Sequence, residues 1–261
     1  MADRIAVVTG ASSGIGEATA RELARHGWLP VLLARRADRL ARLAEELGAE
    51  WETCDVMDRT QVDEVAARVL ARHPAIALLV NNAGVPGRGT FVSTEPETVE
   101  RVLRTNYLGG VWCSRGFLPG LRAALPADGG SHVVNVVSVA GTIAFAPAGP
   151  YAAAKHAQLA FSRSLAATLR PEGIRVHTVL PGFVETEGFT PRSNLKNGLM
   201  RRFVIDADDV ARAIVKAVEK GKREVTIPWF PYRPVSIFQA LFPGVLARLV
   251  GGYGYTPGTQ D

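Results

Sequence analysis

The sequence predicts an α/β protein in which helices cover both faces of a parallel, doubly wound sheet. Short β-branched, apolar runs are typical of buried parallel strands, and they alternate with helical patterns along the chain. The 261 residues are 47% hydrophobic, which is enough for one sizeable core. Since the chain shows no repeat, low-complexity tract or linker, we expect residues 1–261 to form a single domain.

The first expected strand, residues 5–9, leads into a glycine-rich segment. This segment is Thr9-Gly10-Ala11-Ser12-Ser13-Gly14-Ile15-Gly16, and a helical pattern then runs to a stop at Gly27. Glycines let the backbone approach a pyrophosphate, and the helix N-terminus offers unpaired N–H groups and a positive dipole end. The context favours a dinucleotide site over the alternative, a plain strand-to-helix turn.

The second strand, residues 31–34, ends at Arg35-Arg36. An acidic residue about twenty positions after the glycine segment would bind the adenosine ribose and favour NAD. Arg35 occupies that position instead, and a guanidinium suits a ribose phosphate. We therefore favour NADP(H) over NAD(H). The alternative is that these arginines only begin a basic helix, because Arg39 and Arg42 follow.

Later strands end at polar or turn-forming residues. Residues 76–80 precede Asn81-Asn82-Ala83-Gly84, residues 133–137 precede Ser138, and residues 174–180 precede Pro181-Gly182.

Tyr151 and Lys155 are the strongest candidates for chemistry. A tyrosine titrates near ~10 and is a poor acid–base catalyst at neutral pH, but a nearby cation lowers its pKa. Residues four apart share a helix face, so Lys155 can hold its ammonium near Tyr151. Ser138 can donate a hydrogen bond to a substrate oxygen. An exposed aromatic and a solvated charge would be the alternative for an isolated Y-x-x-x-K pattern.

These segments together resemble the short-chain dehydrogenase/reductase family. The resemblance rests on T-G-x-x-x-G-x-G, N-N-A-G, the serine, Y-x-x-x-K and P-G, in the family's order from about residue 4 to residue 226. It implies a Rossmann-type sheet of about seven strands and an oxidoreductase acting between CH–OH and C=O groups.

The resemblance also implies the roles of four residues. Tyr151 would be the general acid or base, Lys155 would also bind the nicotinamide ribose, and Ser138 would orient the carbonyl. Asn106, in an expected helix, would help to hold a water-linked proton relay.

The cofactor residues follow from the same resemblance. NADP-preferring members carry arginine at the position of Arg35, Asp55 matches the position that meets the adenine, and Val56 would pack on that ring. The expected cofactor-binding residues are Gly10, Ser12, Ser13, Gly14, Ile15, Gly16, Arg35, Arg36, Asp55, Val56, Asn82, Ala83, Gly84, Tyr151, Lys155, Pro181, Gly182, Val184 and Thr186.

Residues 183–203 correspond to the family's substrate lid, in which Val184 and Thr186 match positions that touch the nicotinamide carboxamide. The lid is rich in apolar residues, and an apolar pocket wall is expected beside the catalytic residues. These features indicate a small lipophilic ketone, aldehyde or secondary alcohol as substrate. The expected wall residues are Val139, Ala140, Ile143, Phe145 and Pro147.

The tail, residues 228–261, extends beyond the short glycine-rich end of fatty-acid-synthesis reductases. Phe238, Leu241, Phe242, Val245 and Leu249 recur at helical spacing, and Pro243 should kink or divide that helix. The tail is too short and interrupted to span a bilayer. It could cover the substrate pocket, seal a subunit interface or make a peripheral membrane contact. We favour the first two readings.

Composition excludes several classes of function. The net charge of +5 comes from scattered arginines, so we expect no nucleic-acid partner. The two cysteines exclude a disulfide framework and indicate no metal site. We expect a cytoplasmic protein, because the N-terminus lacks a signal-peptide pattern. The family resemblance adds a homodimer or homotetramer. A non-catalytic NADP(H)-binding regulator or scaffold is the alternative function.

Overall fold

Seven parallel strands form the centre of the molecule in the computed structural model, which describes residues 4–87, 89–124, 130–144, 148–187, 189, 191–194 and 201–245. The strand order is β3-β2-β1-β4-β5-β6-β9. This order confirms the predicted Rossmann-type doubly wound sheet, because the chain winds outward from β1 and then restarts beside β1 with β4. The strands are β1 Arg4–Thr9, β2 Trp28–Ala34, β3 Glu50–Thr53, β4 Leu78–Asn81, β5 His132–Val136, β6 Arg175–Pro181 and β9 Glu224–Ile227.

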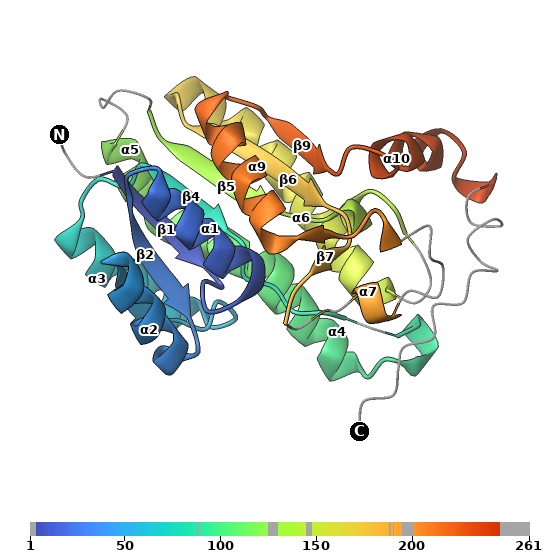
Figure 1. Cartoon of the computed structure of the whole chain (residues 1–261), viewed down its shortest axis with the longest axis horizontal. Helices are drawn as coiled ribbons and strands as arrows, with labels where there is room; N and C mark the ends of the chain where they lie inside the picture. The colour runs from blue at the N-terminus through green and yellow to red at the C-terminus, as the bar shows by residue number, and fades with distance from the viewer. Residues whose placement is uncertain are drawn as a thin grey trace.

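Helices cover both faces of this sheet (Figure 1). Helices α1 and α9 pack together on one face, and α3 and α5 pack together on the other. The principal helices are α1 Gly14–Arg25, α2 Ala37–Leu47, α3 Arg59–Arg72, α4 Pro96–Leu103, α5 Gly109–Ala123, α6 Gly149–Leu169, α9 Ala207–Glu219 and α10 Tyr232–Leu241.

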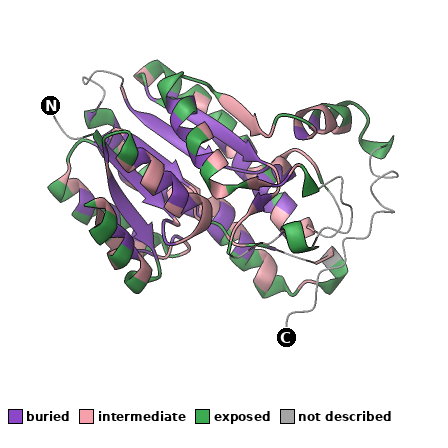
Figure 2. Cartoon of the chain, in the orientation of Figure 1, coloured by how far each residue is buried: buried purple, intermediate pink, exposed green. Residues whose placement is uncertain are grey.

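Alternate residues of each strand enter two separate cores. Val8 of β1 packs with Leu23 and Ile214, from α1 and α9, whereas its neighbour Val7 packs with Val65 and Phe117, from α3 and α5. Both faces of the central strands are therefore apolar and buried, as Figure 2 shows, whereas the edge strands β3 and β9 are only partly buried.

Three local features lie around the carboxyl edge of the sheet or the start of the tail. The expected helix around Asn106 contains a π-helical turn, Arg104–Leu108, between α4 and α5. Beyond β6, the two short strands β7 Val184–Glu185 and β8 Ile205–Asp206 pair in parallel. Helix α10 ends two residues before Pro243, in agreement with the expected effect of that proline.

Candidate active site

The carboxyl ends of β1 and β4 meet at the point where the strand order reverses. Thr9 joins them. Its hydroxyl donates to the carbonyl of Val80 at 3.2 Å and accepts from the amides of Asn82 and Ala83 at 3.0 Å each. The Asn82 side chain returns a hydrogen bond to the Thr9 carbonyl at 2.9 Å. The glycine segment and the Asn82-Ala83-Gly84 loop consequently form one rigid edge.

Glycine is required in the turn after β1. Gly10 and Gly14 have φ values of +66° and +58°, which side-chain-bearing residues rarely adopt. A Cβ at Gly16 would lie 2.3 Å from the Gly10 carbonyl oxygen and 2.5 Å from Nδ2 of Asn82. The first turn of α1 can therefore lie close to the strand end only without these side chains, and its N-terminal N–H groups face the edge of the sheet.

Arg36 contacts the glycine segment directly. Its guanidinium donates to the Ser12 hydroxyl at 2.9 and 3.1 Å and to the Ser13 hydroxyl at 2.6 Å. Arg35, the residue at the position of the ribose-binding acid, has a 64% exposed side chain and lies 3.8 Å from an Asp55 carboxylate oxygen. The two arginines thus occupy different places, and Arg36 is the one that lies next to the loop.

Arg39, in the first turn of α2, reaches the lid segment. Arg39 forms a two-pronged ion pair with Glu187, with one hydrogen bond of 2.7 Å. The hydrogen bond from Arg39, together with its positive charge, holds the pKa of Glu187 below its usual value. This ion pair connects the start of α2 to the segment that follows β7.

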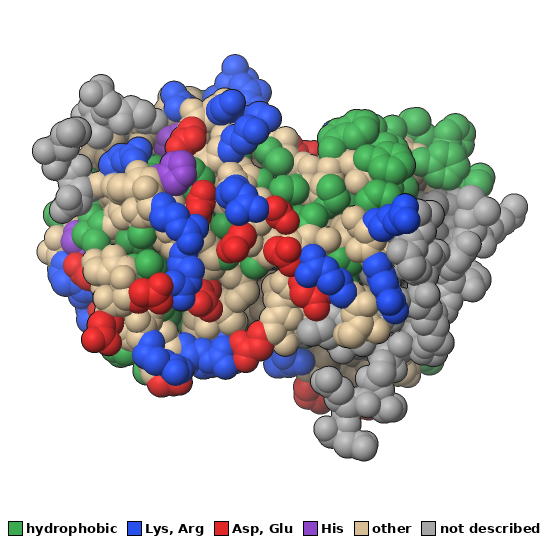
Figure 3. Space-filling model, in the orientation of Figure 1, with side chains coloured by type: hydrophobic (Ala, Val, Ile, Leu, Met, Phe, Trp, Pro, Cys, Tyr) green, Lys and Arg blue, Asp and Glu red, His purple; other side chains and the backbone are tan. Residues whose placement is uncertain are grey.

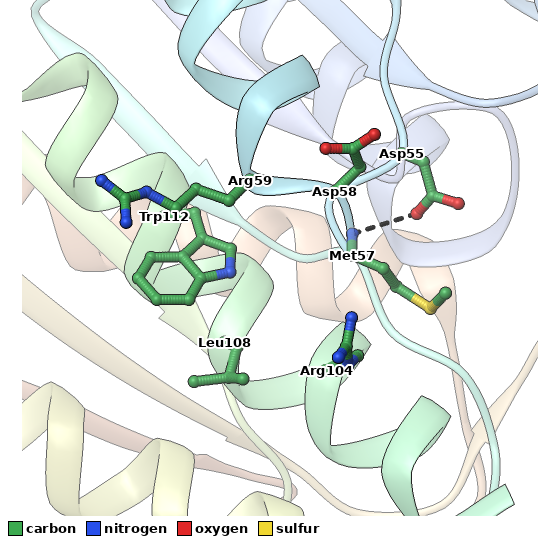
Figure 4. A pocket seen from close by; sticks show the side chains of 7 residues that line it. All are labelled: Asp55, Met57, Asp58, Arg59, Arg104, Leu108 and Trp112. Carbon is green, nitrogen blue, oxygen red and sulfur yellow. Dashed lines mark hydrogen bonds between the residues drawn. The ribbon is translucent and has the colours of Figure 1, made fainter. Parts of the chain in front are cut away.

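Asp55 lies at the mouth of a surface pocket of about 480 Å³ between the β3–α3 connection and the α4–α5 helices (Figure 4). Its carboxylate accepts a hydrogen bond from the Met57 amide at 3.0 Å, and Arg59 lies over the Trp112 ring at 5.5 Å. Val56 packs behind this region against Gly109, where a Cβ would lie 2.7 Å from Val56 Cγ2. Among the described lining residues, none belongs to the predicted catalytic set.

The predicted catalytic residues converge at the ends of β5 and α6. Ser138 follows β5, while Tyr151 and Lys155 lie in the first two turns of α6. The ammonium of Lys155 is 5.7 Å from the centre of the Tyr151 ring. Burial raises the pKa of Tyr151, and its hydrogen bond with Ser138 acts in the opposite direction. The tyrosine is therefore a neutral phenol at pH 7 in the free protein.

Lys155 is buried, with 4% of its surface exposed. Its ammonium donates to the Val136 carbonyl at 3.1 Å and to Oε1 of Gln158 at 2.8 Å. Burial lowers the pKa of Lys155 to about 7. Gln158, itself buried, is a site residue that the sequence reasoning missed. The sequence feature that could have identified Gln158 is its position: it is an amide side chain in an alanine- and leucine-rich helix, three residues after Lys155.

Asn106 holds the backbone beyond the Asn82-Ala83-Gly84 loop. Its Oδ1 accepts from the Val85 amide at 2.7 Å, and its Nδ2 donates to the Val85 carbonyl at 2.9 Å. The side chain is 1% exposed and comes from the π-helical turn, a distortion often found at functional sites. Asn106 thus ties this loop to the π-helical turn between α4 and α5.

The segment after β6 closes the site from the other side. Thr186 lies against the glycine segment, since its Cγ2 would be 3.2 Å from a Cβ at Gly14. Gly182 lies against the ring of Tyr232, where a Cβ would be 2.1 Å from Cε2. The Tyr232 hydroxyl accepts from the Phe183 amide at 3.3 Å. Val184, in β7, is buried.

The structure thus brings most predicted residues to one edge of the sheet, with Ser138, Tyr151 and Lys155 at one end and the glycine segment with Arg36 at the other. The predicted wall residues Val139, Ala140 and Ile143 continue from Ser138. Phe145, Pro147, lid residues 188, 190 and 195–200, and tail residues from 246 onward lie outside the described residues.

Among the described residues, no cluster of three or more His, Cys, Asp or Glu is arranged to hold a metal ion. No helix in the described part of the chain combines the length and the apolar character needed to cross a membrane.

Comparison with known proteins identifies similar chains. The family model described as short chain dehydrogenase matches residues 4–196. The chain is 32% identical over 265 residues to Dehydrogenase/reductase SDR family member 7B of Danio rerio, covering 95% of this chain and 84% of that protein.

Two solved structures are also similar. An alcohol dehydrogenase from the archaeon Thermococcus sibiricus, complexed with 5-hydroxy-NADP, is 29% identical with a TM-score of 0.75 and covers 85% of this chain and 95% of its own. The F189W actinorhodin polyketide ketoreductase with NADPH is 27% identical with a TM-score of 0.76 and covers 86% of this chain and 95% of its own.

Proposed function

Because the chain belongs to the short-chain dehydrogenase family, we propose that it is an NADP(H)-dependent oxidoreductase that interconverts a lipophilic ketone or aldehyde and a secondary or primary alcohol. The observation that carries this proposal is the meeting of Tyr151, Ser138 and Lys155 at the same sheet edge as the glycine segment. One end of that edge suits a dinucleotide, and the other offers a proton donor.

The residues present fit NADP(H). The glycine positions leave a cradle that side chains would fill, and α1 directs its N-terminus at it. Arg36, with the hydroxyls of Ser12 and Ser13, supplies a cation and polar groups for a ribose phosphate, and exposed Arg35 lies beside it. Two similar structures contain 5-hydroxy-NADP and NADPH, which supports the same choice here.

When bound, the nicotinamide supplies or accepts a hydride at the substrate carbon. The protein's own task is to manage the oxygen of that carbon. In the reductive direction, the Ser138 hydroxyl donates a hydrogen bond to the carbonyl oxygen and polarises it. The Tyr151 phenol then donates its proton to the oxygen as negative charge develops there. In the oxidative direction, the phenolate accepts the alcohol proton.

Lys155 assists through its charge. A neutral phenol is a weak acid, and a cation at 5.7 Å from its ring stabilises the phenolate that remains after proton transfer. Val136 and Gln158 hold the ammonium from the side of β5 and α6, which leaves its third N–H for the nicotinamide ribose. Asn106 contributes by fixing the loop at Val85, and a water relay starting from this position is part of the proposal.

The substrate side of the site supports a lipophilic compound. Val139, Ala140 and Ile143 follow Ser138, and the rings of Phe183 and Phe189 lie 6.1 Å apart in the lid segment. Apolar walls with a few polar groups at the reacting atoms are the usual form of small-molecule sites. The oligomeric state and the cytoplasmic location stay predictions.

The Tyr151→Phe variant tests this function. NADPH oxidation would be followed with a panel of lipophilic ketones, aldehydes and β-keto esters, and NADPH binding by its fluorescence. We expect turnover by the native protein and a loss of about 10²- to 10⁴-fold in the variant, because it lacks the proton donor, with unchanged binding.

The matched control is Tyr107→Phe, which removes a phenol hydroxyl from a ring packed on Phe161 outside the predicted catalytic set. Equal turnover by the native and Tyr151→Phe proteins would remove the tyrosine from the mechanism. Tight NADPH binding without turnover across the panel would favour a non-catalytic NADP(H)-binding regulator or scaffold.

A further inference from the structure

Helix α10 has the reverse of the usual polarity of a surface helix. Its polar side chains face the protein. Ser236 is buried and its hydroxyl bonds to that of Thr142 at 2.7 Å. Gln239 accepts from the Ala144 amide at 3.2 Å. Arg233 pairs with Glu224 at 2.8 Å.

The apolar side chains of this region face outward. Leu241 is 66% exposed, and Trp229, just before the helix, is 61% exposed. Figure 3 shows the resulting apolar patch over α10, whereas charged side chains of both signs are scattered over the opposite end of the visible face. We call this patch the tail face. It consists of Trp229, Phe230, Ile237, Phe238, Leu241, Phe242 and Val245. Contiguous exposed apolar surface of this kind marks an interaction site.

Helix α10 is held in place, so the outward direction of its apolar side is set by contacts. Tyr232 is buried against Gly182, and its hydroxyl binds the Phe183 amide. Just before the helix, the Phe230 ring packs edge-on against Phe203 at 5.7 Å. Rotating the helix to bury Leu241 would break the bonds of Ser236 and Gln239 with the loop that follows Ser138.

We propose that the tail face docks on the surface of a lipid bilayer that contains anionic headgroups. Exposed Trp, Phe and Leu side chains bordered by arginine are the composition of segments that lie in a membrane interface. Arg202 is exposed next to Phe203, which contacts Phe230. The sequence has no Asp or Glu between residues 225 and 260, and the chain carries a net charge of +5. An anionic surface therefore meets positive charge without local repulsion.

The charge distribution favours lipid over a second copy of the chain. A two-fold contact would place the same patch against itself. Arg233 is already paired with Glu224, so the exposed cation at the border of the patch is Arg202, and a second copy of the patch would offer it no carboxylate from residues 225–260. An anionic bilayer offers apolar chains for the aromatic groups and phosphates for Arg202.

Docking would also place the substrate entrance near the membrane. Thr142 and Ala144, which bind α10, belong to the loop that begins at Ser138. A lipophilic substrate dissolved in the bilayer would then reach the site with little exposure to water. This consequence rests on the proposed function, whereas the docking itself does not.

The test is flotation of the full chain with vesicles, without cofactor or substrate. Vesicles of phosphatidylcholine alone are compared with vesicles that also contain phosphatidylserine. We expect binding to the phosphatidylserine vesicles that weakens at high salt. The double variant Leu241→Gln, Phe242→Gln should bind at least ~10-fold more weakly, because two apolar side chains that enter the interface are replaced by polar ones.

The matched control is Trp51→Gln, Val92→Gln, which replaces two exposed apolar side chains outside the tail face. This control should bind vesicles as the native chain does, and all three proteins should unfold at similar temperatures. Equal vesicle binding by the native chain and the tail-face variant would overturn the proposal. So would a native chain that ignores vesicles and forms a dimer in light scattering that the tail-face variant disrupts, since the occupant would then be a second copy. Neither result depends on turnover.

Discussion

The buried ammonium of Lys155 should make the stability of the cofactor-free protein depend on pH in a defined way. Lys155→Met removes the charge while keeping most of the side-chain volume. Burial lowers the pKa of this lysine from 10.5 to about 7 in the folded protein. In the unfolded chain the lysine keeps its ordinary pKa, so between pH 7 and 10.5 the unfolded state binds more protons. The contribution of Lys155 to the free energy of unfolding is therefore largest above pH 10.5 and declines as the pH falls toward 7.

The magnitude follows from the shift. Each pKa unit corresponds to about 1.4 kcal/mol, and the folded lysine is half protonated near pH 7 and neutral at pH 9. The difference in free energy of unfolding between the native protein and Lys155→Met should rise by about 2 kcal/mol from pH 7 to pH 9, in favour of the native protein. The lost hydrogen bonds to Val136 and Gln158 add a constant offset that does not affect this trend.

The assay is urea unfolding at pH 7, 8 and 9, followed by circular dichroism in the absence of cofactor. Lys220→Met is the matched control, because Lys220 is exposed at the end of α9 and should follow the native pH trend. If the difference between the native protein and Lys155→Met changes by less than about 0.5 kcal/mol over this range, the ammonium is not desolvated as the structure indicates, and the reasoning fails.

Two further predictions concern the cofactor end of the site. Arg36→Ala should lower kcat/KM about 10- to 100-fold with NADPH and much less with NADH, because it removes a charge-assisted bond to the ribose phosphate. Steady-state kinetics with NADPH and with NADH measure the two losses. Arg42→Ala, on the exposed side of α2, is the control. Equal losses of kcat/KM with the two cofactors would contradict the assignment of Arg36 to the ribose phosphate. Gly16→Ala should weaken NADPH binding at least ~10-fold in fluorescence titrations, since its Cβ would collide with Gly10 and push α1 away. Gly110→Ala, whose Cβ would meet its nearest neighbour at 3.7 Å, should bind normally, and a Gly16 variant that does the same would refute the close-packing argument.

The sequence predicted the sheet because its signals are local. Runs such as residues 5–9 are apolar on both sides, which only a strand buried between two helical layers requires. The four-residue spacing of Tyr151 and Lys155 likewise fixes a shared helix face wherever the helix lies. Motifs that act through backbone geometry or helical spacing were therefore predictable.

Features that depend on contacts between distant segments were not. The sequence could not distinguish which arginine after β2 would turn back to Ser12 and Ser13, and the structure selects Arg36. Gln158 went unnoticed because an amide in a helix has many uses, and its role appears only when the Lys155 ammonium is placed beside it. Helical periodicity identified α10 but gave no indication that its polar side would face inward.

The contact between Gly182 and Tyr232 joins the lid segment to the start of the tail. The tyrosine ring fills the space directly above the glycine, and its hydroxyl holds the first amide of the lid segment. A chain that ended after β9 would lose this support and keep the other anchors of the lid segment, which are the β7–β8 pairing, the contact of Thr186 with Gly14 and the Arg39–Glu187 ion pair. Tyr232 thus helps to hold the lid segment in place, so substitutions at the start of the tail should change the position of the lid without changing a residue that touches the substrate.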